Sequence, residues 1–411
     1  MSSTERHDVV IAGGGTAGLT LACALADALG EGARIAAADR AALTPAGPGD
    51  ARAFALSAGS KRMLAALGVW PQIAEHAQPV TSIDITDSSL EDAFRPVLVS
   101  YNNRVEGGEP ATYIVEHARL HAALLAAAAR RTSIALLGGA AAESFAADEH
   151  GVAVSFAGRA PLRARLLVAA DGGKSRLREA AGIKLVRWSY PQTGIVAIVR
   201  HEEPHGGRAV QHFLPAGPFA ILPLTGNRSC ITWTEEASRA RAILALDDAG
   251  FLAEIEARFD YRLGAVELAG PRASWPLDMH LARAMVANRL ALVGDAAHGV
   301  HPIAGQGLNL GLRDVAALCE VIVDAARLGL DFGSLAILER YERWRRLDSA
   351  LSAATFDALN RLFSNDSTVL RTARDFGLGL VERMPALKQL LVAEAAGLTG
   401  EVPKLLRGER V

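Results

Sequence analysis

The sequence predicts an α/β protein with a doubly wound, mostly parallel sheet, an inserted antiparallel sheet and helices at the C-terminal end. Short apolar runs along the 411 residues lead into turns that carry glycine, an acidic residue or both, as parallel strands do before a ligand-binding turn. Between residues 195 and 234, strand-like runs alternate with Pro/Gly turns, which indicates an antiparallel sheet, and a helical pattern follows over residues 238–263. Helical periodicity prevails after residue 346.

The length of the chain leaves room for two domains, because single hydrophobic cores stop growing near roughly 250–300 residues. We expect one domain to contain residues 1–78, 110–182 and 284–345, where the glycine-rich turns occur. A second, β-sheet domain is expected from residues 79–109 and 183–283, followed by a C-terminal helical region over residues 346–411.

Composition excludes several classes of protein. The net charge of −2 gives no electrostatic case for nucleic-acid binding, and no lysine or arginine run suggests a polybasic membrane patch. Cys23, Cys230 and Cys319 are widely spaced in apolar surroundings, which is typical of buried thiols in a reducing compartment. The first residues contain no apolar signal segment, and no uncharged apolar run reaches the roughly 18 residues of a membrane span. We therefore expect a cytoplasmic protein, either soluble or peripheral.

The first glycine-rich turn follows the predicted strand His7–Ala12 and precedes a predicted helix over Leu19–Leu29. Its sequence is G-x-G-x-x-G: Gly13 permits the tight turn, Gly15 lets a pyrophosphate approach the backbone, and Gly18 allows close packing of helix on strand. Such a motif alone is often only a tight turn. Placed between a strand and a helix, it predicts dinucleotide binding.

A second predicted strand, Arg34–Ala38, ends at Asp39, which follows Gly18 by 21 residues. An acidic side chain at this distance accepts a hydrogen bond from the ribose of a dinucleotide. Farther on, the segment that begins at Asp50 is expected to enter a helix that runs to about Leu67. Arg52 lies in that segment, and it is either a solvated surface charge or a contact to a bound phosphate or flavin.

Two further carboxylates follow predicted strands. Asp171 and Gly172 come after the apolar run 166–170, and Gly294-Asp295 comes after the run 290–293. Because the carboxyl ends of parallel strands meet at one edge of a sheet, we expect all these turns to share one crevice. A glycine-rich loop and a helix follow Asp295, and the start of a helix stabilises anionic or electron-rich ligand atoms.

Other kinds of site lack support. There is no second G-x-G-x-x-G after a strand, so no separate nicotinamide domain is encoded, and no G-x-S-x-G motif suggests a serine hydrolase. His298 and His301 lie in a loop without a third partner nearby, so we predict no metal site. Apolar residues in the predicted antiparallel strands, among them Phe213, Phe219 and Leu222, form either plain sheet core or an apolar wall that faces a ligand.

The three motifs together resemble the three fingerprints of the class A flavoprotein aromatic monooxygenases. More specifically, the stretch GDAAHGVHPIAGQGLNLGLRD, residues 294–314, is similar to the signature of the FAD-dependent hydroxylases of ubiquinone biosynthesis. Tyr190-Pro191-Gln192, the run 213–224, and Tyr341-Glu342-Arg343 with Arg346 also resemble that family. The resemblance covers nearly the whole chain. It implies a Rossmann-like FAD-binding domain of the glutathione-reductase/p-hydroxybenzoate-hydroxylase type with an inserted substrate-binding sheet.

The resemblance also implies roles for residues. Asp39 would hold the adenosine ribose, Asp295 the ribityl chain, and the backbone N–H groups of Leu308 and Asn309 the N1/C2 edge of the flavin. Asp171 and Gly172 would lie near the pyrophosphate. The implied cofactor-binding residues are Gly13, Gly15, Ala17, Gly18, Asp39, Arg40, Arg52, Arg119, Asp171, Gly172, Gly294, Asp295, Gly307, Leu308 and Asn309. Pro302, Gly305 and Gln306 would line the reacting site, and the substrate would contact Phe213, Phe219, Leu222 and Pro223.

The implied reaction is hydroxylation of the aromatic ring of a polyprenylated phenol by O₂, through a flavin C4a-hydroperoxide, with FAD as cofactor and NAD(P)H as reductant. A prenylated substrate implies contact with a membrane, at the periphery of the inner membrane, or with other proteins of ubiquinone biosynthesis. Whether the chain forms a homo-oligomer is left open. Three alternatives remain: a class A hydroxylase or epoxidase of another aromatic or polyketide-like compound, a non-catalytic FAD-containing subunit of a biosynthetic complex, and a reductase or dehydrogenase on the same scaffold.

Overall fold

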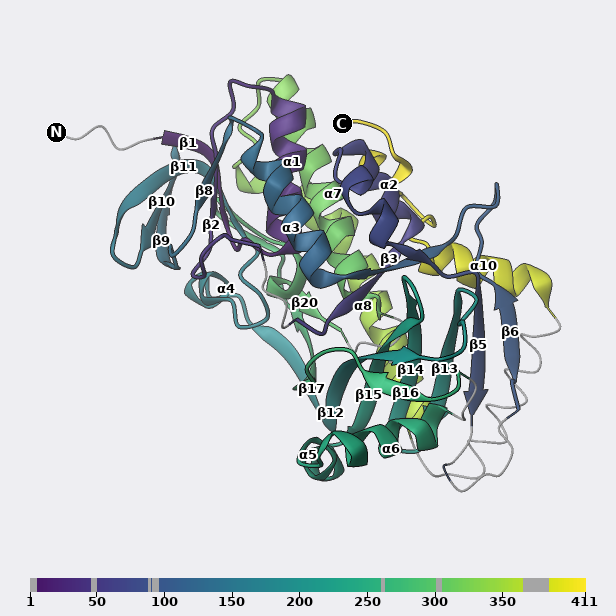
Figure 1. The fold of residues 1–411 in the computed structure, drawn as a ribbon. Helices are drawn as coiled ribbons and strands as arrows, with labels where there is room; N and C mark the ends of the chain where they lie inside the picture. Colours follow the sequence, from purple (N-terminus) through teal and green to yellow (C-terminus); the bar gives the residue numbers. More distant parts are fainter. Residues whose placement is uncertain are drawn as a thin grey trace.

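The computed structural model describes residues 6–45, 50–87, 90, 96–259, 263–300, 305–364 and 384–411. Two large sheets and one three-stranded sheet form its framework (Figure 1). Helices α1 (Thr16–Leu29), α3 (His117–Ala129) and α7 (Gly307–Arg327) lie side by side against the first large sheet. This combination of mixed sheets and helices confirms the predicted α/β class.

The first large sheet, called the parallel sheet below, contains the strands that precede the predicted motifs. Its order is β18 (Val286–Ala287), β19 (Leu290–Leu292), β11 (Arg159–Ala169), β1 (Arg6–Ala12), β2 (Ile35–Ala38) and β8 (Ile134–Leu137), and the hairpin of β9 (Ala142–Asp148) and β10 (Gly151–Phe156) extends from β11. The pairs from β19 to β8 are all parallel. Their central residues are almost fully buried, as apolar runs of parallel strands usually are.

The second large sheet, called the antiparallel sheet below, holds most of the predicted substrate region. Its order is β20 (His298–Gly299), β17 (Ala273–Ala282), β12 (Leu185–His201), β15 (Arg228–Glu236), β14 (Gly217–Leu224), β13 (Arg208–Leu214), β5 (Ser82–Asp87) and β6 (Val99–Asn102), and β16 (Val266–Leu268) pairs with β12. Only the β13–β5 pair in this order is parallel. Helices α5 (Ala237–Leu244) and α6 (Asp248–Phe259) cover one face of it (Figure 1).

The third sheet corrects one prediction. Residues 53–57, expected in a helix, form strand β3 (Ala53–Ser57), which pairs antiparallel with β7 (Thr112–Glu116), and β4 (Gln78–Pro79) pairs with β7 on its other side. Helix α2 (Ala58–Ala66) starts only where this pairing ends, and Ser57 Oγ accepts a hydrogen bond from Ser60 N at 3.1 Å as its cap. Two short 3₁₀ helices follow, η1 (Trp70–Gln72) and η2 (Ala74–His76).

The two large sheets are joined at the third predicted motif. Strand β19 ends at Leu292, the 3₁₀ turn η3 (Gly294–Ala296) follows, and β20 then pairs with β17 of the antiparallel sheet. His298 lies opposite Leu281 in that pairing. The segment that carries Asp295 therefore connects the edge of one sheet directly to the other.

The C-terminal helices connect the sheets a second time. Helix α8 (Leu335–Phe363) is continuous across residue 346, where we expected a separate region to begin, and it packs on α7, β14 and β17. The described residues also form helix α4 (Arg176–Ala180), helix α10 (Pro385–Ala395) and the 3₁₀ helix η5 (Lys404–Arg407). None of the helices described is both long and apolar enough to cross a membrane.

Candidate cofactor and substrate site

The predicted motifs meet at one edge of the parallel sheet. Gly13 N donates to Ala38 O at 2.7 Å, Ala170 N donates to Ala12 O at 2.7 Å, and Val293 N donates to Ala169 O at 3.0 Å. The strands β2, β1, β11 and β19 thus end side by side, each followed by a predicted cofactor residue. This confirms the expectation that the sheet brings the three motifs together.

The glycines of the first motif serve two purposes. Gly13 has a φ of +122°, and a Cβ built on it would lie 2.1 Å from Ala170 O. A Cβ on Gly18 would lie 1.9 Å from Gly13 O, so both glycines are required by the packing of the protein itself. At Gly15, by contrast, a Cβ would meet no described atom within 4 Å, in front of the first turn of α1. This open position beside a helix N-terminus fits a bound pyrophosphate.

Asp39 links the end of β2 to this glycine loop. Its Oδ2 accepts a hydrogen bond from Gly14 N at 2.6 Å, and its Oδ1 accepts one from Ala41 N at 2.8 Å. A carboxylate has about four acceptor positions, so Asp39 retains capacity for a ribose hydroxyl. Arg40 beside it has an exposed side chain.

Arg52 pairs within the protein. Its Nε and Nη2 donate to the two carboxylate oxygens of Asp50 at 2.9 and 2.7 Å, and His117 Nδ1 lies 2.5 Å from the same carboxylate. Burial acts to raise the pKa of Asp50, but the hydrogen bonds from Arg52 and His117 outweigh it and hold that pKa well below its ordinary value. His121 Nε2 lies 3.1 Å from Gly14 O, so α3 packs against the glycine loop, and the exposed Arg119 lies in the first turn of this helix.

The second motif is tied to the third by an arginine that sequence reasoning passed over. Arg178 is only 1% exposed; its Nη1 donates to Ala296 O at 2.9 Å and its Nη2 donates to Gly173 O at 3.0 Å. One guanidinium therefore holds the loop after Asp171 against the loop that contains Asp295. Both partners of Arg178 are backbone carbonyl groups, so the spacing of side chains along the chain carried no signal for this contact.

The two motif carboxylates differ in their surroundings. Asp171 Oδ2 accepts a hydrogen bond from Arg176 N at 3.1 Å, Gly172 next to it has a φ of +83°, and burial raises the pKa of Asp171. Asp295 is exposed to solvent, yet protein atoms crowd around it and raise its pKa. Such a carboxylate fits a ligand hydroxyl.

A buried ionic network holds the segment that carries Asp295. Asp314 is fully buried; its Oδ2 accepts a hydrogen bond from Gly294 N at 3.1 Å and lies 2.6 Å from His298 Nε2. Its Oδ1 accepts one from Arg345 Nε at 2.8 Å. Burial acts to raise the pKa of Asp314, but His298 and Arg345 outweigh it and lower that pKa. Asp314 thus fixes the backbone beside Asp295, a role that the spacing of the sequence did not reveal.

The start of α7 faces the same edge. Asn309 accepts hydrogen bonds from Ser57 N and Ser60 Oγ at 2.9 and 2.8 Å, and its Nδ2 donates to Ala55 O at 2.8 Å. Its side chain therefore joins α7 to β3 and α2, while the backbone N–H groups of Gly307, Leu308 and Asn309 donate to no described residue. These groups fit the predicted flavin edge.

The predicted catalytic loop is described in part. Gly305 has a φ of +63°, and a Cβ on it would lie 3.0 Å from Ala55 Cβ, so this loop packs closely on β3. Gln306 Nε2 donates to Ala395 O at 3.4 Å. Pro302 lies outside the described residues.

The predicted substrate residues divide between the two faces of the antiparallel sheet, because neighbouring residues of a strand point in opposite directions. Phe219 belongs to the core under α5 and α6, with Trp233 and Phe251, and Pro223 points to the same face. Leu222 belongs to an apolar cluster on the other face that includes Ala55, and Phe213 points to that face. This corrects the expected wall: Phe219 is part of the core under α5 and α6, and Pro223 points to that same face, away from Leu222.

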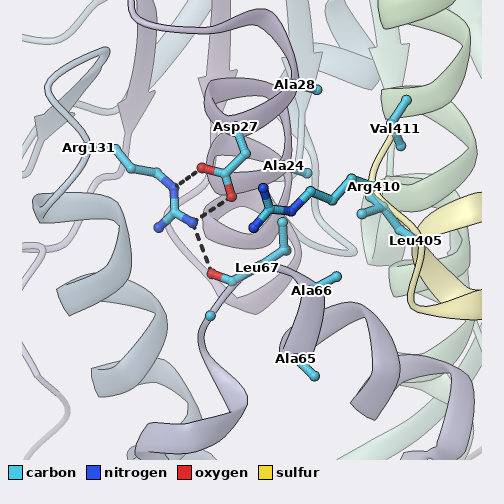
Figure 2. Close-up of a pocket in the computed structure, with 11 residues that line it drawn as sticks. Ala24, Asp27, Ala28, Ala65, Ala66, Leu67, Arg131, Leu405, Arg410 and Val411 are labelled. Atoms are coloured by element: carbon cyan, nitrogen blue, oxygen red, sulfur yellow. Dashed lines mark hydrogen bonds and ion pairs between the residues drawn. The ribbon is translucent and has the colours of Figure 1, made fainter.

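A cavity of about 480 Å³ lies apart from these residues, between α1, the end of α2 and the C-terminal tail (Figure 2). Arg131 donates to both carboxylate oxygens of Asp27 and to Leu67 O in its wall. None of the predicted site residues lines this cavity. The three cysteines are free and buried, and the described part of the chain contains no group of three or more potential metal ligands.

Comparison with known proteins agrees with this geometry. Residues 6–350 match the family described as FAD binding domain. The chain is 45% identical to ubiquinone hydroxylase UbiL of Rhodospirillum rubrum, over 99% of this chain and 94% of that protein. It is 33% identical to the 3-demethoxyubiquinol 3-hydroxylase of Escherichia coli, over 96% of this chain and 100% of that protein.

The fold recurs in the crystal structure of p-nitrophenol 4-monooxygenase PnpA from Pseudomonas putida DLL-E4, with a TM-score of 0.78 at 18% identity, covering 97% of this chain and 99% of that one. The cofactor is FAD, and the protein is an FAD-dependent monooxygenase. The sequence of this chain matches these proteins over most of its length, and the fold brings its three motifs to one sheet edge. This chain therefore belongs to the FAD-dependent hydroxylases of ubiquinone biosynthesis.

Proposed function

We propose that this enzyme hydroxylates the aromatic ring of a polyprenylated phenol, an intermediate of ubiquinone biosynthesis, with O₂ and with NAD(P)H as reductant. The observation that carries the substrate class is the 45% identity, over nearly the whole of both chains, to a protein named ubiquinone hydroxylase. The apolar face that bears Leu222 supports it, because a phenol with a prenyl tail needs such surroundings.

The residues at the sheet edge fit FAD. The open position at Gly15 and the start of α1 would hold the pyrophosphate, Asp39 the ribose, Asp295 the ribityl hydroxyls, and the N–H groups of Leu308 and Asn309 the flavin edge. When bound, FAD supplies the redox chemistry, which is acceptance of a hydride and activation of O₂ for transfer of one oxygen atom. Fixed donors at the start of α7 would stabilise negative charge without reorganisation.

The protein contributes orientation and exclusion of water. Asn309 anchors the start of α7 to β3, and Gly305 packs on Ala55 of the same strand. Strand β3 would therefore hold both the proposed flavin-binding end of α7 and the loop that carries Gly305. Leu222 belongs to the same apolar cluster as Ala55. We propose that this cluster and Phe213 orient the phenol ring and keep water from the reacting atoms.

The test is product analysis under ¹⁸O₂. Purified FAD-loaded protein is supplied with NADPH and either a polyprenylated phenol or a short unprenylated phenol. The masses of the products are then measured by mass spectrometry. We expect one ¹⁸O atom in the ring of the prenylated product and slower labelling of the short phenol. Faster turnover of the short phenol would move the assignment to another aromatic hydroxylase. No labelled hydroxyl in either compound, despite bound FAD, would refute the proposal.

A further inference from the structure

Helix α8 presents an unusual row of exposed apolar side chains. Leu347 and Leu351 are 77% and 65% exposed, and Leu362 is 37% exposed. Together with the exposed Ala354 and Ala358, they occupy successive positions three or four residues apart, which lie on one face of a helix. We call Leu347, Leu351, Ala354, Ala358 and Leu362 the outer row.

Two arginines continue the outer row toward the start of the helix. Arg340 and Arg343 are exposed, fall on the same face, and form no ion pair or hydrogen bond with the described residues. Arg361, beside Leu362, adds a third exposed cation, although it pairs with Asp357. No acidic side chain occupies a position of the row itself. The surface is thus apolar along most of its length, and its unpaired cations lie toward the start of the helix.

The opposite face of α8 holds the helix firmly in place. Tyr341 donates to Leu292 O at 2.7 Å, and Arg345 Nε donates to the buried Asp314. Near the end of the helix, Phe363 stacks on Phe213 with ring centroids 4.0 Å apart, and Asn360 Nδ2 donates to Gln192 Oε1 at 3.2 Å. Because the inner face is fixed at both ends, the outer row is displayed on a rigid element that borders the substrate-binding sheet.

We propose that the outer row docks the enzyme on a lipid bilayer that contains anionic phospholipids, with the leucines at the acyl boundary and Arg340 and Arg343 among the phosphates. An amphipathic helix with leucines on one face and flanking arginines binds such a surface. The proposal rests on the proposed function in one respect: a phenol with a polyprenyl tail resides in the bilayer, and the row ends beside the sheet that would receive it.

Charge argues against a second copy of the chain as the occupant. If two outer rows packed in parallel, Arg343 would meet Arg343; if they packed antiparallel, it would lie near Leu362 and Arg361. The parallel pairing brings two unpaired arginines together without a counter-charge, which costs free energy, and in the antiparallel pairing the carboxylate nearest to Arg343 is Asp357, which already pairs with Arg361. Anionic headgroups supply the missing negative charge.

The experiment is co-sedimentation of the full FAD-loaded chain with two kinds of vesicle, phosphatidylcholine alone and phosphatidylcholine mixed with phosphatidylglycerol. The double variant Leu347→Gln/Leu351→Gln keeps good helix formers on α8 and should lower the partition constant on mixed vesicles by about tenfold or more. The double variant Arg340→Gln/Arg343→Gln should lower it roughly thirtyfold on mixed vesicles and leave binding to neutral vesicles unchanged.

Matched controls lie elsewhere on the surface. Leu328→Gln removes a leucine that is 71% exposed just after α7, and Arg159→Gln removes an exposed arginine of β11 with no described ion pair. Both controls should bind as the unaltered protein does. Wild-type protein that fails to bind mixed vesicles, or leucine variants that bind as tightly as wild type, would overturn the proposal.

Sedimentation equilibrium without vesicles tests the competing occupant. We expect the same mass for the wild type and the Leu347→Gln/Leu351→Gln variant. If the wild type self-associates and does not bind vesicles, and the leucine variant is a monomer, the outer row is assigned to a second copy instead. Vesicle binding is measured without turnover, so a failed docking test leaves ¹⁸O incorporation as a separate test of the hydroxylase, and the reverse also holds.

Discussion

Gly15 and Gly18 belong to one glycine motif, but different neighbours require them. A Cβ at Gly18 would lie 1.9 Å from Gly13 O, whereas a Cβ at Gly15 would enter space that no described atom occupies within 4 Å. The backbone at Gly15 is extended, with φ −75°, so any residue can adopt it. We therefore propose that Gly15 leaves room for the ligand, whereas Gly18 is required by the fold.

This difference predicts opposite phenotypes. Gly15→Val should give folded protein that melts near the temperature of the wild-type apoprotein but lacks the yellow colour of flavin. Gly18→Val should lose about 1–3 kcal/mol or more of stability, because the backbone must shift. Absorbance at the flavin bands and thermal unfolding of the apoproteins measure both effects. A yellow Gly15→Val protein with full flavin content would contradict the predicted pyrophosphate position.

Asp295 should act as a hydrogen-bond acceptor for the cofactor. Its side chain is accessible and belongs to no ion pair within the described residues, so truncation should leave the fold intact. We expect Asp295→Ala to weaken FAD binding about 10- to 100-fold, the value of one or more hydrogen bonds to a charged group. Fluorescence titration of the apoprotein with FAD measures this, with the exposed Glu143→Ala as control. Unchanged affinity would refute the role.

Single residues also show where sequence reasoning stops. The glycines and carboxylates of the three motifs were predictable, because their chemistry depends on local turns after strands. Arg178 and Asp314 were not, because their partners, Ala296 O and Gly294 N, are distant along the chain and become neighbours only when strands β11 and β19 pair. Phe219 and Leu222 have similar character in sequence, and only the register of β14 decides which face each one takes.

The contacts that join α7, α8 and the Asp295 segment depend on the buried carboxylate of Asp314. Removing one partner of a buried ion pair leaves the other uncompensated, so Asp314→Asn should cost about 3–5 kcal/mol of stability. The exposed pair of Arg200 and Glu267 offers a control, since Glu267→Gln should cost less than about 1 kcal/mol. Urea unfolding of the three proteins gives these values. A loss at Asp314 no larger than the control would mean that the network contributes little.

The same network sets a dependence on pH. The pKa of Asp314 is lowered in the folded protein, so its stabilising contribution is present above the pKa of the unfolded chain, about 3.9, and is lost as pH falls through the folded value. The stability gap between wild type and Asp314→Asn should therefore stay constant from pH 7 to about pH 5 and narrow below about pH 4. Urea unfolding at several pH values follows the gap. A gap that widens on acidification would contradict the lowered pKa.

Helices and strands were predicted well where the sequence shows one clear pattern of apolar residues, either a continuous run or a helical spacing. The buried runs of β1, β11 and β19 and the helical spacing of α7 could be read directly. Ala53–Ser57 was predicted as helix and is a strand, because the pairing with Thr112–Glu116 outweighs the helix propensity of its alanines and leucine. The continuity of α8 past residue 346 depends on its contacts with both sheets, which composition does not contain.

Across the whole molecule, FAD should act as a structural ligand as well as a reactant, since its predicted contacts come from β1, β2, β11, β19 and α7. Free FAD at about 100 times its Kd adds about 2.7 kcal/mol to the folded state. With an unfolding entropy of about 2.1 cal/mol/K per residue, cooperative unfolding of this chain should shift upward by about 3 °C. Calorimetry with and without added FAD tests this, and Gly15→Val should show no shift. An unchanged wild-type midpoint would place the cofactor outside the folded core.

The short path from Leu292 in the parallel sheet to His298 in the antiparallel sheet has a consequence for protein engineering. A chimaera that exchanges the substrate sheet with that of a relative cannot treat residues 183–283 as a self-contained cassette, because β5 and β6 at one edge of the sheet precede this range and β20 at the other edge follows it. If the crossover stops at residue 283, β17 of the donor must pair with β20 of the host. A crossover placed after Gly299 keeps that pair together, and the segment carrying Asp295 is then inherited from the donor with its sheet.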